Sequence, residues 1–313
     1  MARKKKRGKS KLTLLIVAIL AVIAFGINEG WFAKLGISSF DDIFSMSGLK
    51  EGEVSDAPFS VHVIDVGQSD SMLIKAPEMN ILVDAGEEGN GQTICSYLES
   101  QGVEKIDLLI ATHPHSDHIG DMDYVIKNME VGKILTGEIP DGAIPTTRVY
   151  EKLLLAASDK GLKIKEVKPG DKYDLGDGCV MTVLGPVEPF EDYNNNSIVC
   201  KIEYKDFSMI FGGDSSKEAE ELLLEENKDL SADLMIVSHH GSSSSTTKAY
   251  LNAINPKYAI ISCGKDNSYG HPHEETLEKL EAKNVTVYRT DLSGNILCET
   301  DGEKIEFSAS NAK

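Results

Sequence analysis

The sequence lacks several features that would place it in common classes of protein. It contains no Cys-x-x-Cys pair, which excludes the usual cysteine-based zinc and thiol-redox motifs. It shows no internal repeat of fixed period, which excludes a solenoid or a propeller. Positive charge is scarce, and the formal net charge is −18 at pH 7. Such a chain repels nucleic acid at long range, so an anionic substrate has to be received locally, by a cation.

The basic residues that are present gather at the N-terminus. Residues 1–28 hold seven of them and no Asp or Glu, so the rest of the chain carries 25 basic against 50 acidic residues. The uncharged run LTLLIVAILAVIAFGI follows the basic block, and its roughly 16 residues are slightly fewer than the ~20 that span a bilayer. A basic end before an apolar run is typical of a signal anchor. We expect residues 1–28 to be an uncleaved anchor; a cleaved signal peptide and a buried core helix are the alternatives.

The remaining chain divides into a linker of mixed polarity at 29–57 and a globular domain at 58–313. With the basic end held in the cytoplasm, the domain would be extracellular, either membrane-anchored or secreted. The five cysteines are widely scattered, at Cys95, Cys179, Cys200, Cys263 and Cys298. Four of them lie in apolar, strand-like runs, which favours buried free thiols, although the odd count leaves a disulfide open.

Hydrophobic periodicity predicts a layered α/β domain. Apolar runs that alternate and end in Gly, Asp or Pro predict strands at 59–66, 71–76, 80–86 and 105–112, with further strands within 163–186, 197–214, 232–241, 258–264, 285–291, 295–302 and 304–310. Amphipathic patterns predict helices at 91–103, 149–161, 217–230, 246–255 and 272–284. Because strands and helices mix without strict alternation, we expect sheets covered by helices.

Histidine is clustered. Seven of the eight histidines fall into three short loops near the ends of predicted strands, within THPHSDHIGD, SHHGS and GHPHEE. Such loops on a rigid scaffold commonly carry reactive centres. In HPHSDH, His113 and His115 are two positions apart and can aim at one point, while Asp117 and His118 turn toward a neighbouring one. These ligands suit Zn, Mn or Fe better than Ca or Mg.

A shared oxygen ligand would let two ions sit about 3.5–4 Å apart, as two-metal hydrolases require. Asp214 is the candidate for this bridge, because the glycines of FGGD let the loop approach closely. The alternative is that Asp214 is an ordinary turn residue.

At this point the sequence resembles a known family. HPHSDH matches the HxHxDH signature of the metallo-β-lactamase superfamily. The order IDVGQSD, ILVDAG, THPHSDHIGD, NNNSIV, FGGD, SHHGS, GHPHEET and YRTDLSG resembles the exported domain of the ComEC competence proteins and their stand-alone relatives. The resemblance spans about Phe59 to Phe307. It implies a four-layer αββα sandwich with two divalent metal ions, zinc or manganese, at one edge between the sheets.

The resemblance also implies roles for individual residues. It places His113 and His115 on the first metal, Asp117 and His118 on the second, and Asp214 between them. Asp84, at the end of ILVDAG, would orient a ligand histidine, or else would be a plain Asp-Gly turn. One member of the pair His239–His240 would complete the second metal, and we favour His240.

Two positions depart from the pattern. Many superfamily members supply another histidine to the first metal, but no His lies between His118 and His239, and the equivalent loop reads NNNSIV. The first metal would then be held more weakly, with more oxygen ligands, or fully only when substrate is bound. Asn195, Asn196 and Ser197 are candidates to contact metal or phosphate, with a polar turn as the alternative. Ser69 replaces the usual Gly near Asp65, and we expect little effect on the metals.

The loop GHPH supplies the remaining candidates. His271 or His273 would donate a proton to the leaving group or hold a phosphoryl oxygen, and we favour His271 over an uninvolved surface loop. The sequence thus predicts an exported metal-dependent hydrolase in which Asp117 and His271 are catalytic. A phosphodiesterase or nuclease acting on single-stranded DNA is the first hypothesis. An esterase of phosphocholine-like envelope diesters and a non-catalytic metal-binding surface protein are the alternatives, and the NNNSIV loop disfavours β-lactam hydrolysis.

Overall fold

The computed structural model describes residues 54–226 and 229–311. The predicted membrane segment in residues 1–28 and most of the predicted linker lie outside the described residues. Within these two ranges, no helix combines the length and the apolar composition that a bilayer span requires.

The described strands and helices follow the predicted order, except that the strand at 130–136 was not predicted. The strands are β1 (Phe59–Val63), β2 (Met72–Lys75), β3 (Asn80–Val83), β4 (Lys105–Ala111), β5 (Glu130–Thr136), β6 (Ile164–Glu166), β7 (Lys172–Asp174), β8 (Val180–Gly185), β9 (Val199–Tyr204), β10 (Phe207–Phe211), β11 (Leu234–Ile236), β12 (Tyr258–Ile261), β13 (Thr286–Arg289), β14 (Ile296–Thr300) and β15 (Ile305–Ala309). The helices are α3 (Gly91–Ser100), α4 (Ser116–Ile119), α5 (Met122–Asn128), α6 (Arg148–Asp159), α7 (Lys217–Glu226), α8 (Lys248–Ile254), α9 (Glu274–Ala282) and α10 (Thr290–Ser293), with 3₁₀ turns η2 (Asp141–Ala143) and η3 (Ser238–Gly241).

These strands form two mixed sheets. The first has the order β15-β14-β1-β2-β3-β4-β5-β6, and the second has the order β13-β12-β11-β10-β9-β8-β7. Each sheet is antiparallel on one side and parallel on the other: β3 to β6 run parallel in the first, and β10 to β13 run parallel in the second. Carboxyl ends of parallel strands share one edge, so the loops after β3, β4, β10, β11 and β12 are the ones that can meet.

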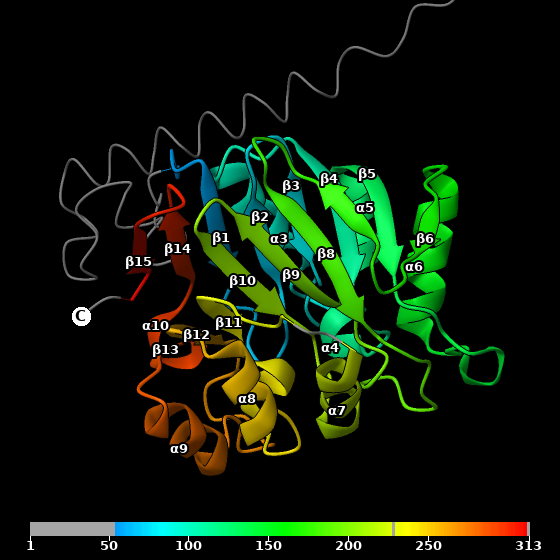
Figure 1. Ribbon diagram of the computed structural model, residues 1–313. Helices are drawn as coiled ribbons and strands as arrows, with labels where there is room; N and C mark the ends of the chain where they lie inside the picture. The colour runs from blue at the N-terminus through cyan, green and yellow to red at the C-terminus, as the bar shows by residue number, and fades with distance from the viewer. Residues whose placement is uncertain (1–53, 227–228, 312–313) are drawn as a thin grey trace, which may run out of the picture. The chain divides into compact units, whose positions relative to one another are not determined.

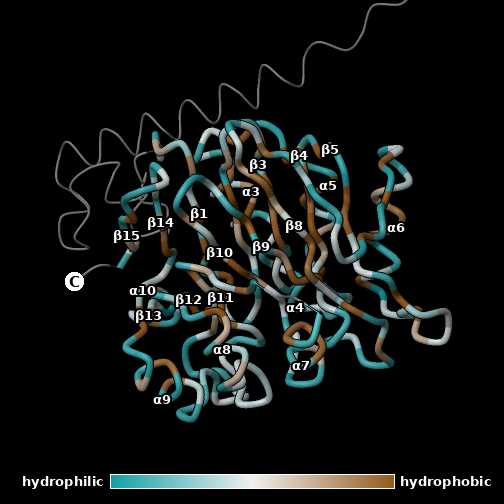
Figure 2. Tube along the Cα trace, viewed as in Figure 1, coloured by the Kyte–Doolittle hydropathy of each residue, from teal (hydrophilic) through white to brown (hydrophobic). Residues whose placement is uncertain are grey.

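Three apolar clusters define four layers. Side chains from the facing sides of both sheets form the central cluster, which includes Phe59 and Phe207. The outer face of the first sheet packs against α3, α5 and α6, and the outer face of the second packs against α7, α8 and α9. In Figure 1, β8 to β10 lie in front of β1 to β4, and Figure 2 shows the strands as largely hydrophobic. Sheets covered by helices confirm the expected layered α/β architecture.

The five cysteines are free and buried. Cys179, Cys200 and Cys298 point into the central cluster, while Cys95 and Cys263 pack beneath the covering helices. The structure therefore bears out buried thiols, and the open alternative of a disulfide is wrong.

Candidate metal centre

Asp84 lies at the end of β3 and orients a histidine of the next loop. Its buried carboxylate accepts hydrogen bonds from the backbone N–H of Thr112 (2.9 Å), the Oγ1 of Thr112 (2.6 Å) and the Nδ1 of His118 (2.8 Å). Because the Nδ1 of His118 donates to Asp84, the neutral ring has its lone pair on Nε2, where it can bind a cation. Asp84 is thus tied to the ligand loop rather than left as a plain turn.

Four side chains converge on one point. Asp117, His118, Asp214 and His240 each turn a ligand atom there, and all four atoms lie within 4.8 Å of one another. The Oδ1 of Asp214 is 3.3 Å from the Nε2 of His118 and 3.8 Å from the Nε2 of His240. The Oδ2 of Asp117 is 3.8 Å and 3.4 Å from the same two nitrogens. Two atoms that each bind a single ion at about 2.0–2.2 Å are separated from one another by distances similar to these four.

The buried atoms of this group are unpartnered. The Nε2 of His118, the Nε2 of His240 and the Oδ1 of Asp214 have no hydrogen-bond partner among the described residues. Buried polar atoms are normally hydrogen-bonded, so three unpartnered acceptors at one point require a partner of another kind. The Nδ1 of His240 donates to the carbonyl of Ser262 at 3.0 Å, so the neutral ring has its lone pair on Nε2 as well. Two such nitrogens and a carboxylate fit a divalent cation.

A second group adjoins the first. His113, His115 and Asp214 contribute ligand atoms that also lie within 4.8 Å of one another. The Nε2 of His113 is 3.0 Å from the Nδ1 of His115 and 3.8 Å from the Oδ2 of Asp214. Asp214 therefore belongs to both groups, through one oxygen to each. This is the arrangement that the sequence analysis placed at HPHSDH and FGGD.

The loop after β10 brings Asp214 between the two groups. Gly213 adopts a φ of +47°, and a Cβ added there would lie 2.7 Å from the Oγ1 of Thr112. Only glycine combines this conformation with so close an approach. The backbone N–H of Asp214 then donates to the Oγ of Ser197 at 3.0 Å, which fixes the start of the loop.

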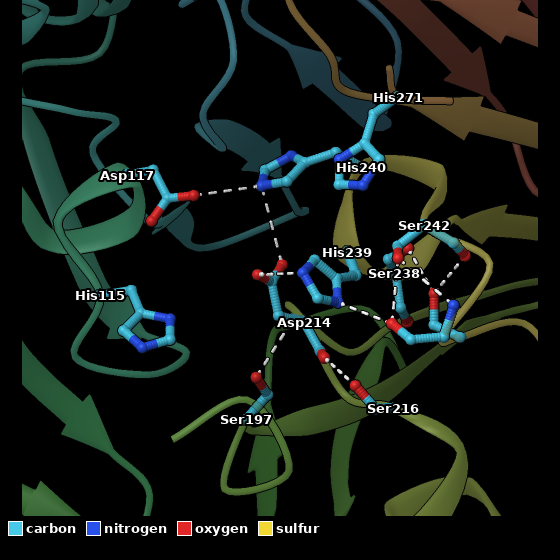
Figure 3. A network of polar contacts seen from close by, with 12 residues as sticks. His115, Asp117, Ser197, Asp214, Ser216, Ser238, His239, His240, Ser242 and His271 are labelled. Atoms are coloured by element: carbon cyan, nitrogen blue, oxygen red, sulfur yellow. Dashed lines mark hydrogen bonds and ion pairs between the residues drawn. The ribbon is translucent and has the colours of Figure 1, made fainter. Parts of the chain in front are cut away.

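The histidines of the pair His239–His240 approach different oxygens of Asp214. Both residues of the η3 turn have positive φ, 55° and 53°. The Nε2 of His240 approaches the Oδ1 of Asp214, whereas the Nε2 of His239 is 3.6 Å from the Oδ2. Figure 3 shows dashed lines from Asp214 to both rings. The Nδ1 of His239 contacts the Oγ of Ser244 at 3.2 Å. His239 lies outside the compact groups, on the side of Asp214 that faces His113.

Facing charges control protonation in the site. Burial lowers the pKa of His118 and of His240, but the carboxylates of Asp214, Asp84 and Asp70 outweigh it and raise both well above 6.5. A binding cation would displace these protons. Burial favours a neutral carboxyl at Asp214, but the charges that His118 and His240 carry when protonated outweigh it and hold the pKa of Asp214 well below its usual range. Burial also keeps the pKa of His113 well below 6.5. An ionised carboxylate and a neutral imidazole are the forms that metal binding requires.

Comparison with known proteins places this geometry in a family. Residues 64–265 match the metallo-β-lactamase superfamily. The chain belongs to the metallo-β-lactamase superfamily. This match covers the loops that carry Asp84, the HPHSDH stretch, Asp214 and the His239–His240 pair.

Competence proteins are among the relatives of this metallo-β-lactamase domain. The chain is 35% identical to ComE operon protein 3 of Bacillus subtilis over 75% of its own length and 32% of that protein. It is 27% identical to the competence protein ComA of Neisseria gonorrhoeae over 90% of its length and 38% of that protein. The chain thus spans about a third of the length of these relatives. In fold it is similar to Igni18, a metallo hydrolase of Ignicoccus hospitalis, with a TM-score of 0.51 and 13% identity over 80% of this chain and 98% of that one.

The NNNSIV loop is built differently from the ligand groups. The side chain of Asn195 bonds to Asp192 and to the backbone of Ser216, and Asn196 bonds to the backbone at 190 and 192. Both amides therefore hold the loop, and the structure does not bring them to the ligand atoms. Ser197 does reach the site, where its Oγ is 3.3 Å from the Nδ1 of His113.

Of the other predicted residues, His271 lies beside a ligand histidine, whereas His273 and Asp65 do not. His271 stacks on His240 with ring centroids 6.2 Å apart, and burial, then the charge of His240, lowers its pKa to about 4. His273 turns away: its Nδ1 accepts from the backbone of Ser243 and its Nε2 faces the carbonyl of Tyr269. Asp65 is an exposed turn residue whose carboxylate accepts from the backbone of Gly67. The structure does not bring His273 or Asp65 to the metal groups.

An open cavity of about 760 Å³ begins at His115. It is lined by His115, Pro140, Gly142, Ala143, Glu191, Asp192, Tyr193 and Asn194. The ring of Tyr193 meets the ring of His115 edge-on, with centroids 5.5 Å apart. A cavity of this size beside ligand residues can receive a substrate.

Sequence reasoning missed Asp70. Its Oδ1 is 3.3 Å from the Nδ1 of His240, and its Oδ2 is 3.9 Å from the Nδ1 of His118. Asp70 thus faces the far side of both histidines. Asp70 is the last residue of IDVGQSD, a motif that the sequence analysis found. The residues around it in the sequence do not indicate that this turn packs behind the metal ligands.

Proposed function

We propose that this domain is a metal-dependent phosphodiesterase, with single-stranded DNA as its first candidate substrate. The observation that carries the proposal is the pair of ligand groups joined through the two oxygens of Asp214. Such sharing supports a two-ion centre of the kind that hydrolyses phosphate esters. The similarity to competence proteins supports the choice of DNA.

Different residues would hold the two ions of such a centre. His113 and His115 would hold one ion; Asp117, His118 and His240 would hold the other; and Asp214 would hold both. Two divalent ions, zinc or manganese, would supply the charge that acidifies a water and neutralises phosphoryl oxygens. The side chain of Asp117 is 31% exposed, whereas those of His118 and Asp214 are buried, so Asp117 can also accept a hydrogen bond from the attacking water and orient it.

The cavity beside His115 favours a second candidate substrate. Glu191 and Asp192 line it together with Tyr193, and this acidic lining repels a long polyanion. An aromatic ring beside carboxylates suits a substrate with a cationic end. A small phosphodiester of a positively charged alcohol, such as a phosphocholine-like envelope group, is therefore the alternative.

One experiment separates these functions. The full chain would be assayed with Mn²⁺ or Zn²⁺ on end-labelled single-stranded DNA and on bis-p-nitrophenyl phosphate, beside Asp117→Ala. Cleavage of both substrates, lost in the variant, supports the nuclease. Turnover of the small diester alone favours the envelope esterase. Bound metal without turnover of either substrate overturns the proposal in favour of a metal-binding protein.

We also propose that the domain lies outside the cell, tethered by residues 1–28. The basic block followed by an apolar run supports this. Protease added to intact cells should digest the domain, and the chain should stay in the membrane fraction. Recovery of a shortened chain from the medium would show a cleaved signal instead, and protection from protease would refute export.

A further inference from the structure

Gln68, in the loop between β1 and β2, crosses to the loop that follows β12. Its Oε1 accepts the backbone N–H of Gly264 at 2.9 Å. The two chains are so close that a Cβ at Gly264 would lie 2.7 Å from the backbone nitrogen of Gln68. Glycine at 264 thus permits a contact that no larger residue would allow without a shift.

This contact fixes the orientation of the Gln68 amide. Rotating the amide by half a turn would set its NH₂ group against the N–H of Gly264, two donors facing each other. With Oε1 on Gly264, the Nε2 of Gln68 is directed at the Nδ1 of His271, 3.3 Å away. An amide NH₂ can only donate, so the Nδ1 of His271 is the acceptor and carries no proton. In the neutral ring the proton is then on Nε2.

Other contacts hold the same ring in place. Asn267 accepts from the backbone N–H of His271 at 3.0 Å and donates to its carbonyl at 2.6 Å. The rings of Tyr269 and His240 both stack with it, with centroids 5.6 Å and 6.2 Å away and interplanar angles of 21° and 24°. No residue within 54–226 or 229–311 forms a hydrogen bond with the Nε2 of His271. A positioned donor beside a metal ligand is therefore left for a substrate.

We propose that Gln68 holds His271 as a neutral imidazole with its proton on Nε2, so that His271 donates a hydrogen bond to a phosphoryl oxygen rather than a proton to the leaving group. Gln68 is a positioning residue in this scheme, and His271 is the group that touches substrate. The role toward phosphate rests on the proposed phosphodiesterase function. The tautomer rests on the two hydrogen bonds of Gln68 alone.

The test reads the tautomer directly. Zinc-loaded full chain labelled with ¹⁵N-histidine would be studied by long-range ¹H–¹⁵N correlation, with His271→Gln to assign the ring. We expect an unprotonated Nδ1 and a protonated Nε2 at His271. In Gln68→Glu, the carboxylate faces the ring and the Nδ1 should acquire a proton, whereas Gln92→Glu on the exposed face of α3 should change nothing. A protonated Nδ1 in the unsubstituted chain overturns the proposal.

Turnover supplies the second readout. Loss of one aimed donor to a developing oxyanion typically lowers kcat by about 100-fold, so Gln68→Glu should lower kcat by that order with its metal content unchanged. A kcat equal to that of Gln92→Glu would overturn the role of His271 toward the phosphoryl group. If the unsubstituted chain turns over no phosphodiester, the proposed function fails, while the spectrum still decides the tautomer.

Discussion

His239 and His240 are consecutive in the chain, yet their rings approach different oxygens of one carboxylate, that of Asp214. Two left-handed residues in succession make this possible, a conformation that non-glycine residues rarely adopt. Backbone strain of this kind costs about 1–3 kcal/mol at each residue and persists where the surroundings impose it. This conformation turns the ring of His240 into the group of Asp117 and His118, and the ring of His239 toward the oxygen of Asp214 that faces His113.

The two histidines should therefore differ in their effect on metal binding. His240→Ala removes a member of the group that contains Asp117 and His118, so the chain should lose one tightly bound equivalent of zinc. His239→Ala should leave that equivalent in place and weaken the other ion about tenfold, by analogy with groups that support ligands. Calorimetric titration with zinc would measure both. His273→Ala is the matched control, and equal losses from the two variants would contradict the division.

Asp84→Asn should weaken metal binding. The amide can present its NH₂ group to the Nδ1 of His118, which would then carry no proton and leave one on Nε2, the ligand atom. Outer partners of this type are worth about 10- to 100-fold in metal affinity. Competition with a chelator would measure the change. Asp65→Asn, in the exposed turn after β1, should bind like the unsubstituted chain; an equal loss there would refute the role assigned to Asp84.

Asp70→Asn should have a smaller effect than Asp84→Asn. The Nδ1 of His240 faces Asp70 at 3.3 Å but also donates to the carbonyl of Ser262 at 3.0 Å, which keeps its tautomer when the carboxylate is lost. We expect a loss in zinc affinity of only several-fold, below the range for outer partners. An affinity loss as large as that of Asp84→Asn would show that the Ser262 carbonyl does not fix the ring.

Gly213→Ala should lower stability and metal content together. Its Cβ would lie 2.7 Å from the Oγ1 and 2.9 Å from the Cβ of Thr112, at a φ of +47°. We expect a fall of about 1–3 kcal/mol in the free energy of unfolding, and displacement of Asp214. Urea unfolding and metal analysis would test this. Gly142→Ala meets nothing within 4 Å and should change neither quantity.

His62 lies apart from the metal site and predicts a pH dependence. Burial, then the charge of Lys75, lowers its pKa from 6.5 to about 3. Folding therefore favours the neutral ring, so its stabilisation is complete above pH 6.5 and is lost as pH falls toward 3. Lowering the pH from 7.5 to 5 should therefore reduce the free energy of unfolding by about 2 kcal/mol through this residue. In urea unfolding over this pH range, His62→Gln should lose less stability than the unsubstituted chain by that amount. Parallel pH profiles of the two chains would contradict the assignment.

The sequence predicts the ligand groups where the relation is local. His113 and His115 alternate on extended backbone, and Asp117 and His118 follow in the short helix α4, so HPHSDH alone predicts that these side chains gather, without knowledge of the fold. Asp70 and Gln68 could not be placed, because their partners His240, Gly264 and His271 lie roughly 170 to 200 positions away along the chain. Their roles depend on how the β1–β2 loop packs against the loops after β11 and β12.

The ends of two elements were also predicted wrongly from the sequence. The acidic pattern predicted a helix over 217–230, but α7 covers Lys217–Glu226, and the carboxylate of Asp229 accepts hydrogen bonds from Ser231. The stretch 285–291 read as strand throughout, whereas β13 ends at Arg289. There Thr290 exchanges hydrogen bonds with the backbone of Cys263, which ends the strand and begins α10. A tertiary contact thus ends β13, whereas the hydrogen bonds of Asp229 to Ser231 are local.

The buried thiols have a consequence for how the domain can be made and kept. Burial raises the pKa of all five, so almost none is in the nucleophilic form at neutral pH. No covalent cross-link has to form during biogenesis, and dithiothreitol has none to break. The same architecture is therefore attainable under oxidising and reducing conditions alike, with no oxidoreductase to assist it.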